Sequence, residues 1–301
     1  MAWRDELRRL VAEGEVRFDE PMRHHTSFRI GGPAEALVVP ASRRELRAAV
    51  EFAFERDLPW FILGRGTNLL VRDGGVRGLV IKTTRCLRSI AFTGLEVRVE
   101  AGFSLNELAC EAAARSLSGL AFAAGIPGTV GGGIYMNAGA YGGEIGQMVL
   151  SVTAYHPGRG ERSWLREELG FGYRTSRFQD ERAIIEEARL RLVPGDAAAI
   201  RAEMEDYARR RQEKQPLNLP SAGSVFRRPP GSYAGALIEE AGLKGLRVGG
   251  AQISERHANF IVNLGGARAA DVLALIELVR TRVKERTGVL IEPEVEVIGI
   301  D

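Results

Sequence analysis

The stretch GIPGTVGGGIYMNAGAYGG, residues 125–143, contains eight glycines in nineteen positions. Glycine lets the main chain adopt positive φ and approach a ligand without an intervening Cβ, so that clustered N–H groups can surround a phosphate or a flat ring. The segment therefore predicts a site for a nucleotide-type cofactor. A tight structural loop without a ligand is the alternative.

A second glycine-containing turn, GRGTN at 64–68, follows an apolar segment, 59–63, that we expect to be a buried strand. The end of such a strand is a usual place for a ligand-binding turn in an α/β unit. The turn is neither a Walker loop, because no Gly-Lys-Ser/Thr follows it, nor the GxGxxG fingerprint of Rossmann folds. A diphosphate-binding turn and a plain strand-to-strand turn both stay open.

The composition limits the class of protein. The chain has 301 residues, enough for two or three domains, and its 45% hydrophobic and 27% charged content predicts a folded core. A formal net charge of only +2 gives no reason to propose nucleic acid as a partner. The first residues lack an apolar leader and no later stretch suits a bilayer, so we expect no membrane partner and a cytoplasmic location.

Metal and dithiol sites are not expected. The two cysteines, Cys86 and Cys110, lie far apart without a CxxC pattern, which argues against a disulfide scaffold, a zinc site or a redox dithiol. The adjacent His24 and His25 would point to opposite faces of a strand, and no other ligand type stands at a suitable spacing. The arginine run 209–211 is interpreted as a solvated helix face rather than a phosphate site.

The periodicity of the chain predicts a mixture of helices and strands. Ser42 is a predicted N-cap with Glu45 at the capping-box position, and Ser104 and Glu107 repeat this pattern. A β-α-β unit is expected over 36–63, and three short strands with a hairpin turn at Thr93-Gly94 over 79–100. Further predicted helices cover 2–13, 104–115, 196–214 and 269–286, and further strands cover 149–156, 183–192, 251–253, 260–263 and 289–300.

Three polar residues stand among apolar or turn residues: Arg174, Ser224 and Glu294. No GxSxG elbow surrounds Ser224, so a hydrolase triad is not indicated. A serine hydroxyl that is not activated is protonated at neutral pH, which suits it to give a proton to a basic carbon centre. An arginine and a glutamate nearby could hold a carboxylated substrate. A buried ion pair between Arg174 and Glu294 is the structural alternative.

Eight segments in order resemble the UDP-N-acetylenolpyruvoylglucosamine reductase family, the flavoenzymes of peptidoglycan-precursor synthesis. The resemblance covers nearly the whole chain at consistent spacing. The segments are HTSFRIGGPA (25–34), ILGRGTNLLV (62–71), AGIPGTVGGGIYMNAGAYGGEI (124–145), YRTSRF (173–178), KQP (214–216), SAGSVFRRPPG (221–231), GGAQISERHANFIVN (249–263) and EPEVEVIG (292–299).

The resemblance implies an α+β fold: an FAD-binding two-subdomain fold of the vanillyl-alcohol-oxidase/PCMH type plus a C-terminal α/β substrate-binding domain. Mapped on this chain, the domains would be 1–80, 81–195 and 196–301. The cofactor would be non-covalent FAD, with NADPH as co-substrate and a UDP-sugar as substrate. FAD would pass hydride from NADPH to the enolpyruvyl group. We expect a monomer.

The family's motifs also imply roles for individual residues. Arg174, Ser224 and Glu294 match its catalytic arginine, proton-donor serine and catalytic glutamate. Tyr173, Lys214 and Gly223 match substrate-binding positions, and Lys214 could equally be an exposed charge. The residues expected to line FAD are Leu63, Gly64, Arg65, Gly66, Thr67, Asn68, Gly125, Ile126, Pro127, Gly128, Thr129, Gly131, Gly132, Asn137, Ala138, Gly139 and Ala140.

The chain departs from the family's pattern at Arg228. Arg228 stands four residues after Ser224, where many relatives have asparagine, so no substrate contact is carried over there. The chain resembles the branch without the tyrosine-bearing substrate loop. Two alternative functions stay open from the sequence: an FAD-linked oxidase on the same scaffold, and a non-catalytic UDP-sugar binder.

Overall fold

The computed structural model describes residues 2–301, which form two compact units. The larger unit consists of residues 2–17, 36–65 and 78–210, and the smaller unit of residues 18–35, 66–77 and 211–301. The chain crosses from one unit to the other inside three strands: β1 (Glu15–Pro21), β2 (Pro33–Val39) and β5 (Val76–Lys82). The domain boundaries expected near residues 80 and 195 stay a prediction.

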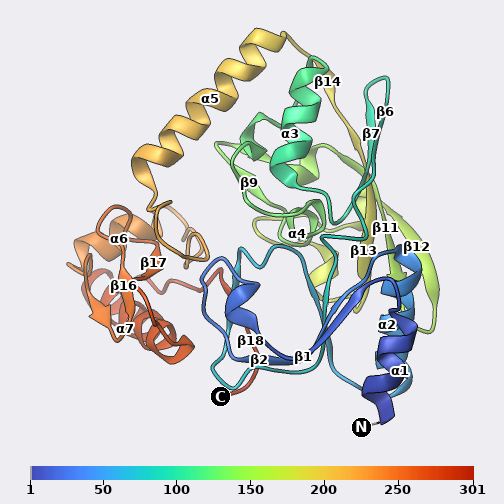
Figure 1. The fold of residues 1–301 in the computed structure, drawn as a ribbon. Coiled ribbons are helices and arrows are strands. Elements are labelled where there is room, and N and C mark those ends of the chain that lie inside the picture. The colour runs from blue at the N-terminus through green and yellow to red at the C-terminus, as the bar shows by residue number, and fades with distance from the viewer. Residues whose placement is uncertain (1) are drawn as a thin grey trace. The chain divides into compact units, whose positions relative to one another are not determined.

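A five-stranded antiparallel sheet dominates the larger unit, with strand order β12-β11-β13-β7-β6 (Figure 1). The hairpin predicted at Thr93-Gly94 joins β6 to β7, and Gly94 has φ 59°. The strands are β6 (Ile90–Thr93), β7 (Glu96–Glu100), β11 (Val149–His156), β12 (Gly160–Leu165) and β13 (Ile184–Arg191). All but β12 confirm strands predicted from the sequence, and β12 was not predicted.

Side-chain caps begin two helices of this unit as predicted. The Ser42 hydroxyl accepts from the N–H of Glu45 at the start of α2 (Arg43–Glu55), and Ser104 accepts from Glu107 at the start of α3 (Leu105–Ala114). The Glu45 carboxylate instead accepts from the backbone N–H groups of Glu13 and Ala41, because the chain folds these donors over the end of the helix. The other helices that begin in this unit are α1 (Ala2–Leu10), α4 (Val130–Tyr135) and α5 (Ala197–Lys214).

The predicted β-α-β unit consists of β2, α2 and β3 (Trp60–Leu63), but β2 and β3 are not neighbours. The sheet has the order β1-β2-β5-β3, and β5 pairs parallel with β3. This insertion of a later strand is a long-range pairing that local periodicity does not encode. The other short pairs are β9 (Gly139–Ala140) with β10 (Gly143–Glu144), and β8 (Leu117–Ser118) with β14 (Val193–Pro194).

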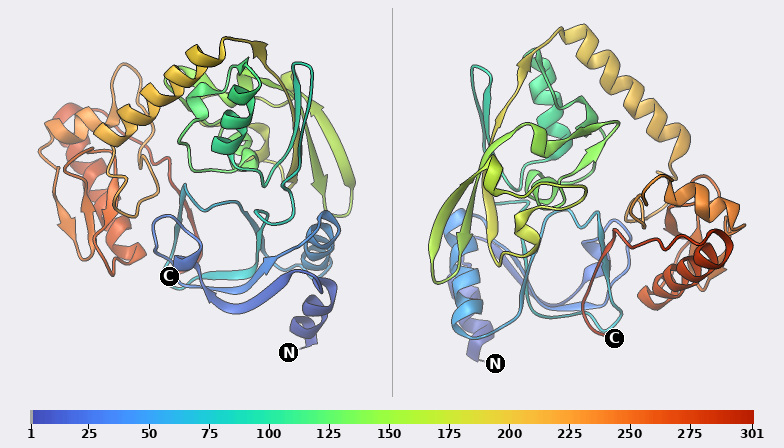
Figure 2. Two further views of the ribbon diagram at one scale, coloured as in Figure 1. Left: turned by 45° about the horizontal axis from the view of Figure 1, so that its top comes forward. Right: turned by 180° about the vertical axis from the view of Figure 1, so that it is seen from behind.

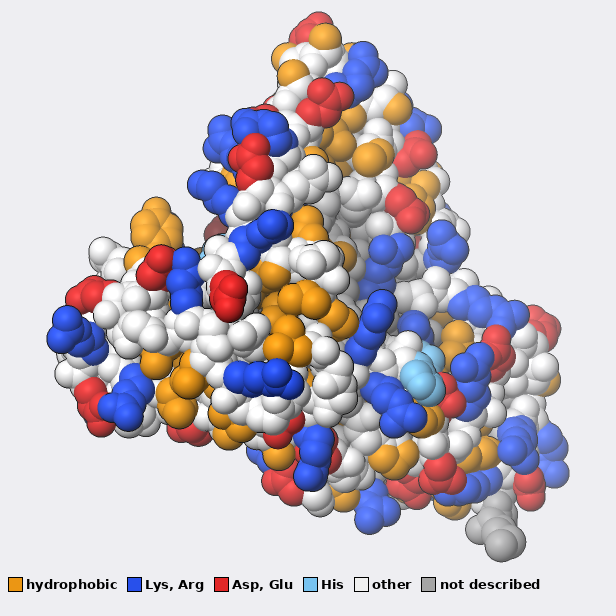
Figure 3. Space-filling model, turned by 60° about the vertical axis from the view of Figure 1, so that its left-hand side comes forward, with side chains coloured by type: hydrophobic (Ala, Val, Ile, Leu, Met, Phe, Trp, Pro, Cys, Tyr) orange, Lys and Arg blue, Asp and Glu red, His pale blue; other side chains and the backbone are white. Residues whose placement is uncertain are grey.

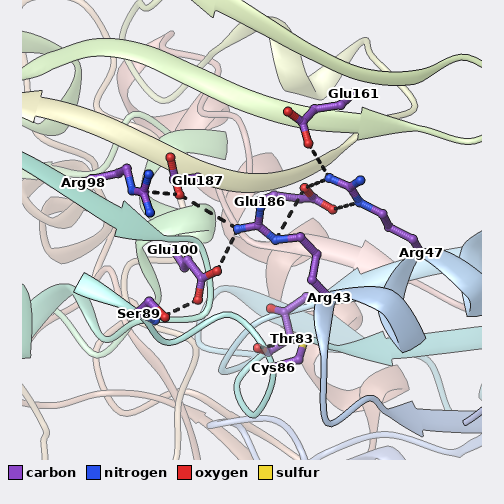
Figure 4. A network of polar contacts seen from close by, with 10 residues as sticks. All are labelled: Arg43, Arg47, Thr83, Cys86, Ser89, Arg98, Glu100, Glu161, Glu186 and Glu187. Carbon is purple, nitrogen blue, oxygen red and sulfur yellow. Dashed lines mark hydrogen bonds and ion pairs between the residues drawn. The ribbon is translucent and has the colours of Figure 1, made fainter. Parts of the chain in front are cut away.

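A network of charged side chains joins α2 to the five-stranded sheet (Figure 4). Glu186 of β13 is fully buried and accepts from Nε of Arg47 at 2.7 Å and from its Nη2. This hydrogen bonding raises the pKa of Arg47 above its usual value. Arg43 bonds Glu100 of β7 at 2.7 Å, and Arg47 also reaches Glu161 of β12. Both views of Figure 2 show α2 beside these strands.

The smaller unit has its own hydrophobic core, which draws on three separate parts of the sequence. Phe28, Ile30 and Leu70 pack with residues of 222–295. The core lies among a helix pair, a three-stranded antiparallel sheet and a short parallel pair. These elements are α6 (Ala234–Glu240), α7 (Ala269–Thr287), β15 (Arg247–Val248), β16 (Ala251–Ile253), β17 (Ile261–Asn263), and β4 (Leu69–Val71) with β18 (Glu296–Ile298).

The strand predicted for 289–300 is shorter in the structure: Glu296–Ile298 forms a strand parallel to β4, and Pro293 and Ile300 form isolated antiparallel bridges. Pro293 interrupts a regular ladder because it has no N–H. The 3-10 helices are η1 (Met22–His24), η2 (Ala121–Ala123), η3 (Ile145–Gln147), η4 (Arg166–Glu168) and η5 (Arg177–Gln179).

Acidic and basic side chains are interspersed on the face drawn in Figure 3, in keeping with the net charge of +2. Within residues 2–301, no helix has the length and apolar character needed to cross a bilayer.

Candidate active site and cofactor-binding segments

The two glycine-containing segments predicted to bind a cofactor meet in the larger unit. Thr129 is the N-cap of α4, and its hydroxyl accepts from the N–H of Gly132 at 3.2 Å. A Cβ built on Gly64 would lie 2.7 Å from Oγ1 of that threonine. Glycine at position 64 therefore lets its main chain lie directly against the Thr129 side chain, and Gly132 at the start of α4 is exposed. This arrangement fits the diphosphate of a dinucleotide cofactor.

Other glycines of the segment are needed by the protein's own packing. A Cβ on Gly131 would lie 2.9 Å from Cβ of Ala101, and one on Gly143 would lie 2.5 Å from the ring of Phe122. Both the structural and the ligand-binding interpretations of this segment therefore apply, at different positions.

A small hairpin follows α4 and is fixed by aromatic stacking. Tyr141, which has φ 53°, lies between β9 and β10 and stacks on Tyr207 of α5 with ring centroids 4.2 Å apart and an interplanar angle of 4°. Its hydroxyl also donates to the backbone oxygen of Tyr207 at 3.3 Å.

Asn137 is buried, has φ 42°, and uses its side chain for internal hydrogen bonds. Its Nδ2 donates to Glu144 and to the carbonyl of Gly172, both at 2.9 Å, and its Oδ1 accepts from the N–H of Gly146 at 3.0 Å. The side chain thus braces the loop, and a contact between this residue and the cofactor stays a prediction.

Arg174 lies against the glycine-rich segment. It occupies a turn in which Gly172 and Thr175 exchange both backbone hydrogen bonds at 3.2 Å, and its φ is 56°. Its Nη2 donates to the carbonyl of Gly139 at 3.0 Å. The half-exposed ring of Tyr173 has its centroid 5.1 Å from the guanidinium carbon. The larger unit therefore brings the predicted catalytic arginine to the predicted cofactor segment.

Ser224 and Glu294 lie on adjacent segments of the smaller unit. The N–H of Glu294 donates to the carbonyl of Val225 at 2.7 Å, and Phe226 forms an antiparallel bridge with Pro293. Both predicted catalytic side chains are half-buried. Gly223, just before the serine, has φ 77° and no atom within 4 Å of a built Cβ.

Asn259 holds the serine segment in place and was not expected from the sequence. Its side-chain amide accepts from the N–H of Phe226 and donates to the carbonyl of the same residue, each at 2.9 Å. Its own carbonyl accepts from the N–H of Val225 at 2.8 Å. The two side-chain hydrogen bonds join residues 33 positions apart in the sequence. The pairing therefore leaves no local pattern from which it could be predicted.

The second half of the GRGTN turn lies beside Glu294. Asn68 Nδ2 donates to the carbonyl of Glu294 at 3.1 Å, and the N–H of Glu296 donates to the carbonyl of Asn68 at 3.0 Å. Gly66 has φ 62°, and a Cβ there would lie 2.4 Å from the carbonyl oxygen of His25. The Asn68 side chain therefore orders the glutamate segment, and the contact of this turn with a cofactor stays a prediction.

Lys214 is exposed at the end of α5, where Arg256 binds the helix carbonyls. The Arg256 Nη1 donates to the carbonyls of Gln212 at 3.2 Å and Gln215 at 3.4 Å. Burial lowers the pKa of the neighbouring His257, with smaller contributions from Lys244 and Lys214.

The arginine run 209–211 is only partly the solvated face that we predicted. Arg209 and Arg210 pair with Asp206 on exposed surface, whereas Arg211 is 6% exposed. The prediction is wrong for Arg211, because a helix turns each successive side chain by about 100° and so carries the third one inward.

Two further observations concern the ligands that this chain can bind. The Arg228 guanidinium stacks on Tyr233 at 4.1 Å and its Nε donates to the carbonyl of Ser232, so it is engaged within its own loop.

Residues 2–301 hold no group of three or more His, Cys, Asp or Glu side chains that could bind a metal ion.

Two family models match different parts of this chain. A family model described as "FAD binding domain" matches residues 34–166, and one described as "UDP-N-acetylenolpyruvoylglucosamine reductase, C-terminal domain" matches residues 215–298. These matches confirm the predicted fold class, an FAD-binding part followed by a C-terminal domain. They also support FAD as the cofactor.

Similar proteins cover almost the whole chain. UDP-N-acetylenolpyruvoylglucosamine reductase 2 of Symbiobacterium thermophilum is 51% identical over 98% of this chain and 96% of its own length. The reductase of Rubrobacter xylanophilus is 50% identical over 94% and 95%. The crystal structure of UDP-N-acetylenolpyruvylglucosamine reductase (MurB) from Thermus caldophilus has a TM-score of 0.79 and 40% identity, covering 94% of this chain and 98% of that one. The chain therefore belongs to the UDP-N-acetylenolpyruvoylglucosamine reductase (MurB) family.

Proposed function

We propose that this protein reduces UDP-N-acetylenolpyruvoylglucosamine to UDP-N-acetylmuramate in peptidoglycan-precursor synthesis, with non-covalent FAD as cofactor and NADPH as hydride source. Family membership supports the reaction. The observation that carries the assignment of residues is the hydrogen bond from the N–H of Glu294 to the carbonyl of Val225, which sets the glutamate beside Ser224 in the smaller unit.

The cofactor segments fit FAD as described above. Gly64 and Thr129, with the surrounding main chain, would hold the diphosphate, and the remaining predicted residues of 63–68 and 125–140 would line the cofactor. When bound, FAD supplies the hydride transfer from NADPH to the methylene carbon of the enolpyruvyl ether, which is chemistry that no side chain can provide.

The chain's own residues bind the substrate and manage charge and protons. Arg174 binds the substrate carboxylate through its planar N–H groups and stabilises the negative charge that develops next to it. Glu294 acts on the same substrate carboxylate, either as the protonated acid or through a water molecule. Ser224 Oγ gives the proton that completes the saturation. The UDP-sugar is bound by Tyr173, Lys214 and Gly223. The Lys214 ammonium pairs with its phosphates.

We further propose that the enzyme acts as a monomer in the cytoplasm and binds no nucleic acid. The interspersed charges and the net charge of +2 support the last statement.

An anaerobic titration tests the function. NADPH is expected to bleach the visible flavin bands of the purified protein, and the enolpyruvyl UDP-sugar is expected to restore them. Ser224→Ala is expected to keep the bleaching and to slow the recovery by ~10²-fold, a typical general-acid contribution. Ser232→Ala, which removes a hydroxyl of the same unit, is the matched control and should leave both steps unchanged.

Three results would contradict the proposal. A colourless protein that takes up no FAD would exclude the flavin chemistry. Recovery of the bands by O₂ but not by the UDP-sugar would indicate an oxidase instead. Equal recovery in Ser224→Ala and the parent would remove Ser224 from the mechanism.

A further inference from the structure

The side-chain amide of Gln179 lies between two backbone carbonyls. The function proposed above gives this side chain no role. Its Nε2 donates to the carbonyl of Arg174 at 2.9 Å and to that of Tyr135 at 3.1 Å. The amide carries two hydrogens, so it can serve both acceptors at once. Sulfur of Met136, a weak acceptor, lies 3.6 Å away. Gln179 thereby connects the turn that carries Arg174 to the end of α4.

The backbone of Arg174 needs such support. A φ of 56° lies in the left-handed region, which residues other than glycine and asparagine rarely adopt. Such a conformation persists only where surrounding contacts impose it. The turn itself supplies two hydrogen bonds, between Gly172 and Thr175. Since Gln179 binds the carbonyl of the strained residue directly, it opposes the rotation of the peptide that would release the strain.

A second amide and a hydroxyl hold the same turn from the other side. Asn137 donates to the carbonyl of Gly172 at 2.9 Å, and Ser176, which is buried, donates to the carbonyl of Tyr135 at 2.8 Å. All three polar side chains tie residues 172–176 to residues 135–137 of the glycine-rich segment. The turn is therefore positioned by the same segment that is proposed to bind the cofactor.

The direction of the arginine head group follows from this anchoring. Its Nη2 bonds the carbonyl of Gly139, so Arg174 is fixed at its backbone by Gln179 and at its tip by Gly139. A guanidinium carries five N–H groups in one rigid plane, so a hydrogen bond at one of them restricts the directions of the others. Binding a carboxylate through two parallel N–H groups depends on that direction, and small displacements of such groups cost much of their effect.

We propose that Gln179 is a positioning residue that holds Arg174 ready for the substrate carboxylate. The proposal rests on the proposed function for its substrate. Gln179 does not touch the reacting atoms, and it acts only through the orientation of Arg174.

Three variants of Gln179 in the FAD-loaded enzyme test it. Gln179→Met removes both donors at similar length and volume, Gln179→Glu places an acceptor opposite two carbonyls, and Gln179→Lys restores donors. The control is Gln252→Met, because Gln252 Nε2 makes the same kind of bond to a backbone carbonyl, that of Gly245, at 3.0 Å in the smaller unit.

Two measurements are made on each variant. In stopped-flow half-reactions, Gln179→Met is expected to keep NADPH bleaching within about twofold of the parent and to slow reoxidation by the enolpyruvyl UDP-sugar ~10-fold or more, as expected when a positioned group is displaced. Gln179→Glu should be slower still, Gln179→Lys should recover part of the rate, and Gln252→Met should match the parent. Hydrogen exchange, which is independent of activity, should be faster in the peptide 171–178 of Gln179→Met.

The outcomes separate the two proposals. Parent-like reoxidation in Gln179→Met, or an equal loss in Gln179→Met and Gln179→Lys, overturns the positioning role. Equal slowing of both half-reactions also overturns it, because it indicates general damage. If the parent flavin is not reoxidised by the UDP-sugar, the proposed function fails and the substrate role of Gln179 fails with it. Unchanged exchange in 171–178 would show separately that Gln179 does not hold the turn.

Discussion

A Cβ on Gly64 would lie 2.7 Å from the hydroxyl oxygen of Thr129, so two segments far apart in the sequence meet where position 64 has no room for a side chain. We therefore expect Gly64→Ala to displace the start of α4, to destabilise the protein by about 1–3 kcal/mol, and to weaken FAD retention. The FAD-to-protein ratio after gel filtration measures the effect.

Gly235→Ala is the matched control for that substitution. Gly235 lies in α6, and a Cβ there would meet its nearest neighbour at an ordinary 3.4 Å. Full FAD content in both variants would mean that the meeting of Gly64 and Thr129 has no bearing on the cofactor.

The buried carboxylate of Glu186 depends on Arg47. Arg47→Ala leaves a fully buried acid without its bidentate partner, and such a loss typically costs about 3–5 kcal/mol. We expect the lower part of this range, because Arg43 Nε still lies 3.8 Å from Glu186. Chemical denaturation provides the measurement. Arg98→Ala removes an exposed partner of Glu187 and should change the stability by less than about 1 kcal/mol; equal losses in the two variants would refute the prediction.

Burial of His257 makes the stability depend on pH. Because burial lowers the pKa of His257 below 6.5, the unfolded chain takes up this proton at a higher pH than the folded chain. The stabilisation is thus present above about pH 6.5 and is lost as the pH falls through the folded value. His257→Gln should flatten the free energy of unfolding against pH in that window. The control is His24→Gln, at an exposed histidine, which should leave the pH dependence of the free energy of unfolding unchanged. A parent protein whose free energy of unfolding is already independent of pH in that window would contradict the prediction.

The two cysteines are expected to differ in reactivity. Burial raises the pKa of Cys86 to about 12, whereas Cys110 is exposed. Since the thiolate is the reactive form, a disulfide reagent at pH 8 should label one thiol rapidly in the native protein and two in denaturant. Cys110→Ser should abolish the rapid phase. A rapid phase that survives this substitution would assign it to Cys86 instead.

Local signals in the sequence predicted local structure well. The caps at Ser42 and Ser104 and the hairpin at Thr93-Gly94 depend on residues within one turn, and all three are present. The position of β5 between β2 and β3 depends on contacts with distant segments. Such contacts leave no trace in the periodicity of the segment itself.

The same division applies to the candidate site. The motifs identified Arg174, Ser224 and Glu294, and the structure sets each in a defined local environment. The amides of Gln179 and Asn259, which fix the neighbouring backbones, were missed because glutamine and asparagine are common surface residues. The available signals were that Gln179 directly follows the YRTSRF motif and that Asn259 lies inside the segment 249–263.

The chain passes between the two units inside β1, β2 and β5, and this has a consequence for the design of fragments. A fragment covering only 211–301 would lack Phe28, Ile30 and Leu70, although these side chains fill the same hydrophobic core as Val225 and Val272. Expressed by itself, such a piece would leave an apolar surface to water and is expected to aggregate. Shuffling of modules between relatives should therefore exchange residues 18–35 and 66–77 together with the C-terminal segment.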